Sequence, residues 1–169
     1  MARGDDRKGA GKGPVRSGSA SGIPPSYGIG GLPYFGYRLA VTAKLFDRKF
    51  IEILQAHSAL TLPQWRAVAQ LGLSEPGTVR SLADGAAVDR AEVSRALARL
   101  VDQGLVARDD NSGDQRSPQF TLTADGRKIY ETVRKPVSRF IRQLIEQIDE
   151  ADIEAADRVL WAVSKGCLD

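Results

Sequence analysis

The chain has 169 residues, of which 42% are hydrophobic and 27% charged, so it can bury a core and fits one domain with an additional segment. No stretch reaches the roughly 18 consecutive apolar residues of a membrane span, and residues 1–13 are too polar for a secretory signal. Cys167 and His57 are the only residues of their types, which excludes an internal disulfide and argues against a zinc site. We therefore expect a cytoplasmic protein without a metal or cofactor.

The net charge of +3 comes from the N-terminal segment. Residues 1–33 hold five basic and two acidic side chains, whereas residues 34–169 hold 19 of each. We expect residues 1–30 to be a disordered basic tail, because they are rich in Gly, Ser and Pro and carry few large apolar side chains. Charge is also segregated near the C-terminus: residues 121–145 hold six basic and two acidic groups, and residues 146–169 hold two and seven.

Apolar side chains recur at helical spacing in three segments before residue 86. The first helix is predicted to run for about 24 residues from Tyr34. The second begins after Thr61, a suitable N-cap, and ends at Gly72. The third is short and covers residues 78–85.

The fourth predicted helix has the clearest start signal in the chain. Asp89 is followed three residues later by Glu92, which is the spacing of a capping box with Asp in place of Ser or Thr. Gly104 stands where a helix commonly ends. The buried stripe of this helix is expected to consist of Val93, Leu97 and Leu100.

The periodicity then changes from helix to strand. Residues 105–108 and 119–123 read as two strands, and residues 109–114 between them have turn composition. Pro118 restricts the second strand to an edge or places its start after the proline. A hairpin directly after such a set of helices is typical of a winged helix–turn–helix.

Two more helices are predicted at the C-terminus, over residues 124–148 and 151–165, and Pro136 should kink the first of them or remove one backbone hydrogen bond. The first and last helices carry more apolar surface than one small lobe covers, so we expect a homodimer. The fold class is therefore mainly α with a small β-hairpin. Its parts are a winged helix–turn–helix DNA-binding lobe over residues 61–123 and a helical dimerisation region over residues 34–60 and 124–165.

The outward face of the fourth helix favours double-stranded DNA as a partner. Arg95 can fork onto guanine O6 and N7, a contact worth about 1–3 kcal/mol of base discrimination. Arg90 lies in the first turn, Ala91 can contact a thymine methyl group, and Ser94 can donate to a phosphate or a base. The alternative is an ordinary solvated helix face.

Asp114 and Arg116 occupy the predicted hairpin tip. They form either a surface ion pair of small energetic value or a unit in which Asp114 orients Arg116 toward a minor groove. Spacing alone does not separate the two interpretations.

Six short segments together resemble the MarR family of bacterial regulators: residues 61–65, 82–83, 93–97, 100–108, 114–116 and 122–126. The resemblance covers about residues 34–165. It implies a homodimeric winged-helix protein whose first and last helices form the dimer interface. It also implies that the fourth helix enters the major groove and the wing enters the minor groove of a pseudo-palindromic operator.

Carried over residue by residue, the resemblance places Ser94 and Arg95 at recognition-helix positions. Asp114 and Arg116 match the wing motif, which favours the minor-groove interpretation. Pro118, directly behind the wing, departs from the family pattern, and the pattern says nothing about the long N-terminal tail.

The resemblance also implies a small aromatic acid as effector, bound between the dimer helices and the DNA-binding lobe. Arg38 is the expected partner of the carboxylate, because a guanidinium forks onto two oxygens. Trp65 can instead be a core residue and His57 a helix-end group, and a regulator without an effector remains open. The candidate wall consists of Tyr34, Phe35, Tyr37, Arg38, Phe46, His57, Trp65 and Arg66.

The sequence thus predicts a ligand-responsive transcriptional regulator, most simply a repressor. The alternative is a winged-helix module that binds a protein partner. No phosphate-binding loop, nucleophile with a supporting base or metal cluster indicates an enzyme. Cys167 lies close to the C-terminus, where an unreactive thiol is expected.

Overall fold

The computed structural model divides the chain into two compact units, residues 1–45 and 46–169, which are described separately. Residues 1–27 of the predicted tail lie outside the described residues. Residues 111–116, at the predicted tip of the wing, also lie outside them. The described residues are 28–29, 32–33, 35–86, 88–110 and 117–168.

The first unit contains a strand pair that the sequence did not predict. Strands β1 (Gly28–Ile29) and β2 (Leu32–Pro33) are antiparallel, with Gly28 opposite Pro33. The same unit contains the beginning of helix α1 (Phe35–His57), whose 23 residues confirm the predicted long helix.

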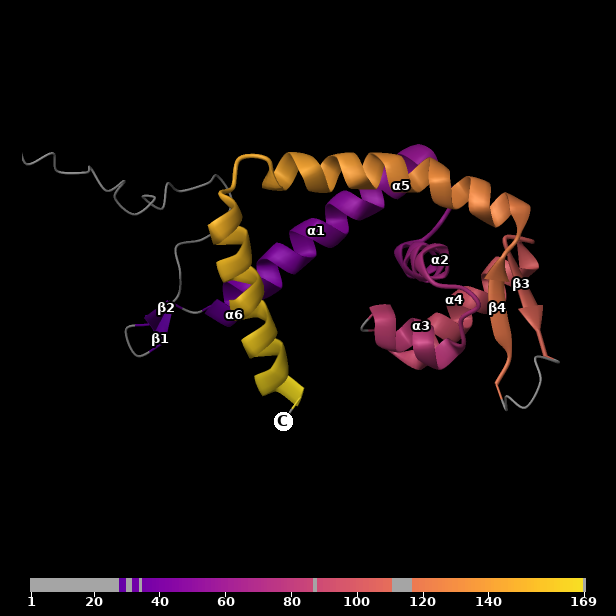
Figure 1. Ribbon diagram of the computed structural model, residues 1–169, viewed down its shortest axis with the longest axis horizontal. Helices are drawn as coiled ribbons and strands as arrows, with labels where there is room; N and C mark the ends of the chain where they lie inside the picture. Colours follow the sequence, from indigo (N-terminus) through magenta and orange to yellow (C-terminus); the bar gives the residue numbers. More distant parts are fainter. Residues whose placement is uncertain (1–27, 30–31, 34, 87, 111–116, 169) are drawn as a thin grey trace, which may run out of the picture. The chain divides into compact units, whose positions relative to one another are not determined.

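The second unit contains a winged helix–turn–helix lobe, as predicted (Figure 1). Helices α2, α3 and α4 pack on one another, and α2 also contacts α5. The most deeply buried side chains of the lobe include Val68, Leu71, Leu97 and Leu100. The elements in order are α2 (Leu62–Leu73), α3 (Val79–Ala86), α4 (Arg90–Asp102), β3 (Val106–Asp109), β4 (Gln119–Leu122), α5 (Ala124–Ile145) and α6 (Glu150–Leu168).

Both predicted N-caps are confirmed. Thr61 and Gln64 form a full capping box, in which the Thr61 backbone N–H donates to Gln64 Oε1 at 2.9 Å. Asp89 accepts hydrogen bonds from the backbone of Ala91 at 2.8 Å and of Glu92 at 3.2 Å. Because a cap satisfies backbone donors that the helix leaves free, it fixes where α2 and α4 begin.

The wing is an antiparallel pair in which Val106 lies opposite Leu122. The backbone of Gly77, just before α3, exchanges two hydrogen bonds with Phe120 at 3.0 and 2.8 Å, a bridge that the sequence did not predict. The Leu122 N–H donates to Glu75 Oε2 at 2.8 Å. The wing is therefore tied to the segment that leads into α3.

The two C-terminal helices have other bounds than predicted. Helix α5 continues through Pro136 but ends at Ile145, and α6 runs from Glu150 to Leu168. The reason lies in the backbone between them: Ile148 donates to Ile145, and Asp149 accepts from the first turn of α6, so a turn replaces the last predicted turn of α5. None of the described helices is long and apolar enough to cross a bilayer.

Candidate nucleic-acid interface and effector cavity

Helix α4 presents one buried and one exposed face, divided as the periodicity predicted. Val93, Leu97 and Leu100 are at most 4% exposed. The outward residues Ala91, Ser94, Arg95 and Ala98 are all exposed. Arg95 makes no hydrogen bond or ion pair with any residue that the structure describes, so its guanidinium is available to a ligand. The small neighbours leave room for a close approach of the helix backbone to that ligand.

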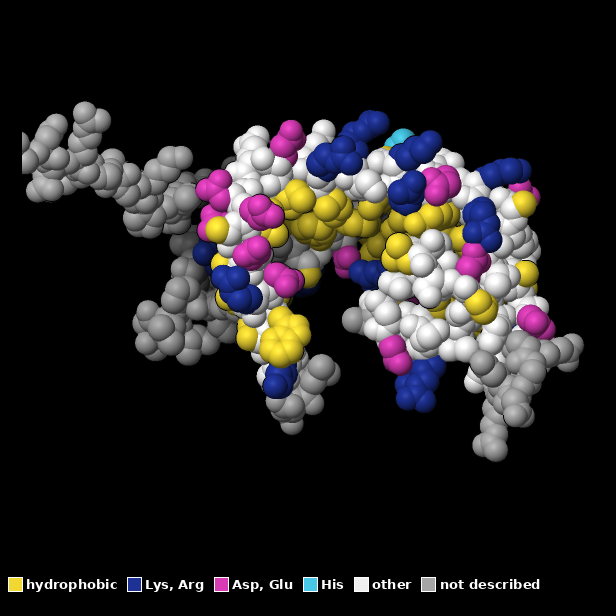
Figure 2. All heavy atoms as spheres, in the orientation of Figure 1, with side chains coloured by type: hydrophobic (Ala, Val, Ile, Leu, Met, Phe, Trp, Pro, Cys, Tyr) yellow, Lys and Arg dark blue, Asp and Glu magenta, His cyan; other side chains and the backbone are white. Residues whose placement is uncertain are grey.

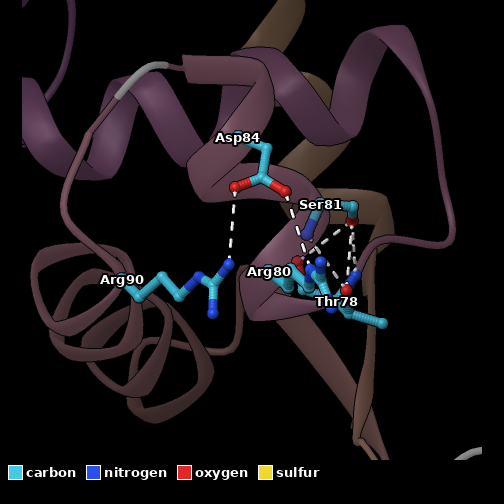
Figure 3. Close-up of polar contacts among 5 residues, drawn as sticks. All are labelled: Thr78, Arg80, Ser81, Asp84 and Arg90. Carbon is cyan, nitrogen blue, oxygen red and sulfur yellow. Dashed lines mark hydrogen bonds and ion pairs between the residues drawn. The ribbon is translucent and has the colours of Figure 1, made fainter. Parts of the chain in front are cut away.

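Arg90 shares a carboxylate with a second arginine that the sequence analysis did not single out. Its Nη2 lies 3.8 Å from Asp84, and Arg80 Nε lies 3.8 Å from the same carboxylate (Figure 3). Beside them, Thr78 and Ser81 form a reciprocal cap at the start of α3, where the Ser81 N–H donates to Thr78 Oγ1 at 3.1 Å. Two cations and a helix N-terminus thus lie next to the first turn of α4, an arrangement suited to phosphate groups.

The wing side of this surface is described only in part. Asp114 and Arg116 fall within residues 111–116, outside the described residues. Arg108 on β3 donates to Asp110 at 2.8 Å. A hollow of about 440 Å³ separates α4 from the wing, and its lining includes Ser94, Ala98, Arg108 and Pro118.

A second cavity, of about 360 Å³, lies between the C-terminal half of α1, α2 and the end of α3. Its polar wall is an ion pair: Arg66 on α2 donates to Asp47 on α1 at 2.8 Å. Both side chains are partly exposed, so solvent and solutes reach the pair. The complete lining is Phe46, Asp47, Phe50, Leu62, Trp65, Arg66, Ala69, Gln70, Gly85 and Ala86.

The cavity brings together three of the eight residues predicted to form the effector wall: Phe46, Trp65 and Arg66. Phe46 and Trp65 line it, and Trp65 is also a core residue, 5% exposed and stacked on Tyr130 at 6.1 Å between ring centroids. His57, at the C-terminal end of α1, is exposed and is not among the lining residues. Arg38 is exposed on the part of α1 that belongs to the first unit, and the side chain of Phe35 is outside the described residues.

Residues 60–117, which include α2, α3, α4 and β3, match the MarR family. This segment is similar to a MarR family domain. The HTH-type transcriptional regulator FarR of Neisseria gonorrhoeae is 38% identical over 80 residues, which are 46% of this chain and 53% of the relative, so the match spans about half the length of that protein. The homoprotocatechuate degradative operon repressor of Escherichia coli is 29% identical over 66% of this chain and 74% of its own length.

The fold of solved MarR proteins agrees with that of this chain. MarR of Staphylococcus aureus, in complex with salicylate and kanamycin, aligns with a TM-score of 0.67 over 79% of this chain and 90% of its own, at 18% identity. An identity of this size shows the shared fold alone.

Within the segment that matches the MarR family, the sequence analysis missed Arg80 and Asp84, and outside it Asp47. A local signal existed for the first two, because Thr78, Arg80 and Ser81 start a helix and Asp84 is one turn further on. No local signal existed for Asp47, whose partner Arg66 lies 19 residues away.

Proposed function

We propose that this protein is a dimeric, sequence-specific DNA-binding repressor that a small aromatic acid releases from a pseudo-palindromic operator. The observation that carries the proposal is the exposed face of α4, where Arg95 has no partner among the described residues and is flanked by small side chains. Such a face fits a major groove, in which Arg95 contacts guanine, Ser94 contacts a phosphate or base, and Ala91 contacts a thymine methyl group.

The phosphate backbone on either side of that groove is the proposed partner of the remaining cations. Arg90 and Arg80 flank the start of α4, next to the N-terminus of α3. On the other side, the wing with Asp114 and Arg116 is proposed to enter the minor groove. Contacts to phosphates position a protein on the duplex, whereas contacts to base edges specify the sequence.

A second copy of the chain is proposed to cover the apolar side chains that the C-terminal helices leave exposed. Ile145 on α5 is 44% exposed, and on α6 Leu160 is 43% and Trp161 67% exposed. Apolar surface of this extent on one pair of helices marks an interface. Residues 34–60 and 124–165 are then the dimerisation region and residues 61–123 the DNA-binding lobe, and a two-fold dimer reads two half-sites of one palindrome.

The effector is proposed to occupy the cavity between α1, α2 and α3. Its volume of about 360 Å³ suits a single aromatic ring with small substituents, and Phe46, Phe50 and Trp65 supply aromatic walls. Arg66, in place of Arg38, is the proposed partner of the ligand's carboxylate. That carboxylate competes with Asp47 for the guanidinium, so binding loosens the link between α1 and the lobe and alters the placement of α4 on DNA.

The test is DNA binding by the purified protein. A palindromic fragment is selected from a random pool and titrated at several salt concentrations, with and without salicylate. The proposal expects a steep loss of affinity with salt, because phosphate neutralisation releases counterions, and a weaker complex in salicylate. Absence of any preferred sequence would favour a module that binds a protein partner, and an unaltered complex in every aromatic acid tried would favour a regulator without an effector.

A further inference from the structure

The outer face of α5 carries three cations without partners. Lys135, Arg139 and Arg142 are spaced four and three residues apart, so they lie along one face of the helix over about 10 Å. All three are exposed, and none forms a hydrogen bond or ion pair with any residue in the described parts of the chain. We call these residues the basic line.

Other cations of α5 are satisfied within the helix. Lys128 donates to Asp125 at 2.9 Å, and this hydrogen bond and the charge of the carboxylate raise the pKa of the ammonium group. Arg134 donates to Glu131 at 2.9 Å, which raises the pKa of its guanidinium in the same way. The basic line therefore differs from these cations of the same helix, because its charges form no ion pair with the described residues.

Helix α6 carries an acidic line with the same spacing. Glu150, Glu154 and Asp157 are again four and three residues apart, and Trp161, one turn further, continues the same face. Only Glu154 has a partner among the described residues, an exposed ion pair with Arg158 at 3.8 Å that contributes little. Trp161 is 67% exposed, with only the ammonium group of Lys165 over its ring at 5.6 Å among the described contacts, so most of its apolar surface is open to a partner.

The two lines do not meet within one chain. No ion pair joins α5 to α6 among the described residues, and acidic side chains gather over α6 while basic ones lie along α5 (Figure 2). The two stripes match in spacing and are opposite in charge, and the described residues of one chain do not pair them, so a second molecule can do so.

We propose that the basic line of one copy pairs with the acidic line of α6 in a second copy, with Trp161 covered at the same contact. The inference rests on the dimer proposed above, and it adds the contact that determines how the two copies align. Apolar burial of side chains such as Leu160 and Ile148 supplies the affinity. The charged lines favour the one alignment in which opposite charges face each other, because an alignment that brings like charges together is destabilised by their repulsion.

The experiment measures the dimer dissociation constant of the full chain by sedimentation at low salt and without DNA. One variant reverses the basic line (R139E with R142E), a second reverses the acidic line (E154R with D157R), and a third combines all four changes. A control, R99E with R108E, makes the same change in net charge as the reversal of the basic line, but on the DNA-binding lobe. Circular dichroism confirms that each variant is folded.

Each reversed line is expected to weaken the dimer about tenfold or more, and the combined variant to recover to within about threefold of the parent, because the opposite charges face each other again. The control should stay within about threefold of the parent. If either reversal leaves the dimer unchanged, or if the combined variant stays weak, the inference is overturned while the dimer itself stands. A parent chain that is monomeric at all concentrations overturns both the inference and the proposed dimer.

Discussion

Arg66 on α2 donates a hydrogen bond of 2.8 Å to Asp47 on α1 across the wall of the aromatic cavity. The pair makes the cavity neutral overall, although it contains a cation that suits a carboxylate. It also connects the long helix α1 to the helix on which the DNA-binding lobe is built. An acid that takes Arg66 therefore changes a contact between two structural elements as well as filling a space.

The two members of this pair should have opposite effects on the affinity for salicylate when each is replaced. R66Q deletes the charged donor and is expected to weaken binding about tenfold or more, since a hydrogen bond to a charged group is worth about 1.5–3 kcal/mol. D47N removes the competitor and should tighten binding. Titration calorimetry measures both, with the uncharged salicylamide as a matched ligand whose affinity stays the same. Equal affinities of parent and R66Q would remove Arg66 from the site.

Arg95 is expected to carry base preference and Arg80 to carry general affinity. R95A should lose about 1–3 kcal/mol of discrimination between the selected palindrome and a variant altered at its guanines. R80A should weaken both fragments alike and lower the salt dependence by about one counterion. Fluorescence anisotropy over a salt series separates the two. The assignment of α4 to the groove is wrong if R95A keeps its full discrimination.

Asp84 holds Arg80 and Arg90 at 3.8 Å and stands beside the proposed path of the phosphates. D84N removes a negative charge there and frees both guanidinium groups. Affinity for random-sequence DNA should then rise about threefold at low salt, and the ratio of specific to random binding should fall. A weaker complex with random DNA would contradict this role.

At Gly126, helix α5 lies against the backbone of Leu105, directly before the wing. A Cβ added there would overlap the backbone oxygen of Leu105, so G126A should destabilise the fold by about 1–3 kcal/mol in urea unfolding. Gly166 in α6 offers a matched control, because a Cβ there meets nothing within 4 Å. G166A should be neutral or gain up to about 1 kcal/mol. Equal stability of the two variants would show that the close approach is absent.

The parts of this structure that the sequence predicts are those encoded within a few residues. Asp89 caps its own helix, and Val93, Leu97 and Leu100 form one stripe at helical spacing, so the start of α4 and its two faces follow from local chemistry. Gly104 has a φ of +70°, which glycine adopts without strain, directly after the C-cap of α4.

The parts that the sequence does not predict depend on residues far apart in the chain. Gln64, 3% exposed, donates to Gln103 across 39 residues, and Leu122 donates to Glu75 across 47. The cavity shows the same limit: residue type suggested Phe46, Trp65 and His57 equally, but only the fold puts the first two on its wall. The end of a helix such as α5 depends on which backbone hydrogen bonds form there, those of the helix or those of a turn. The spacing of apolar residues does not predict that choice.

Chemical probing of guanine N7 on the selected DNA fragment tests the central claim most directly, because N7 lies in the major groove. The account predicts two groups of protected guanines about one helical turn apart. The R95A variant should protect neither group, and adding salicylate to the parent complex should make both groups reactive again. Guanines that remain reactive throughout a fully bound fragment would contradict the insertion of α4 into the major groove.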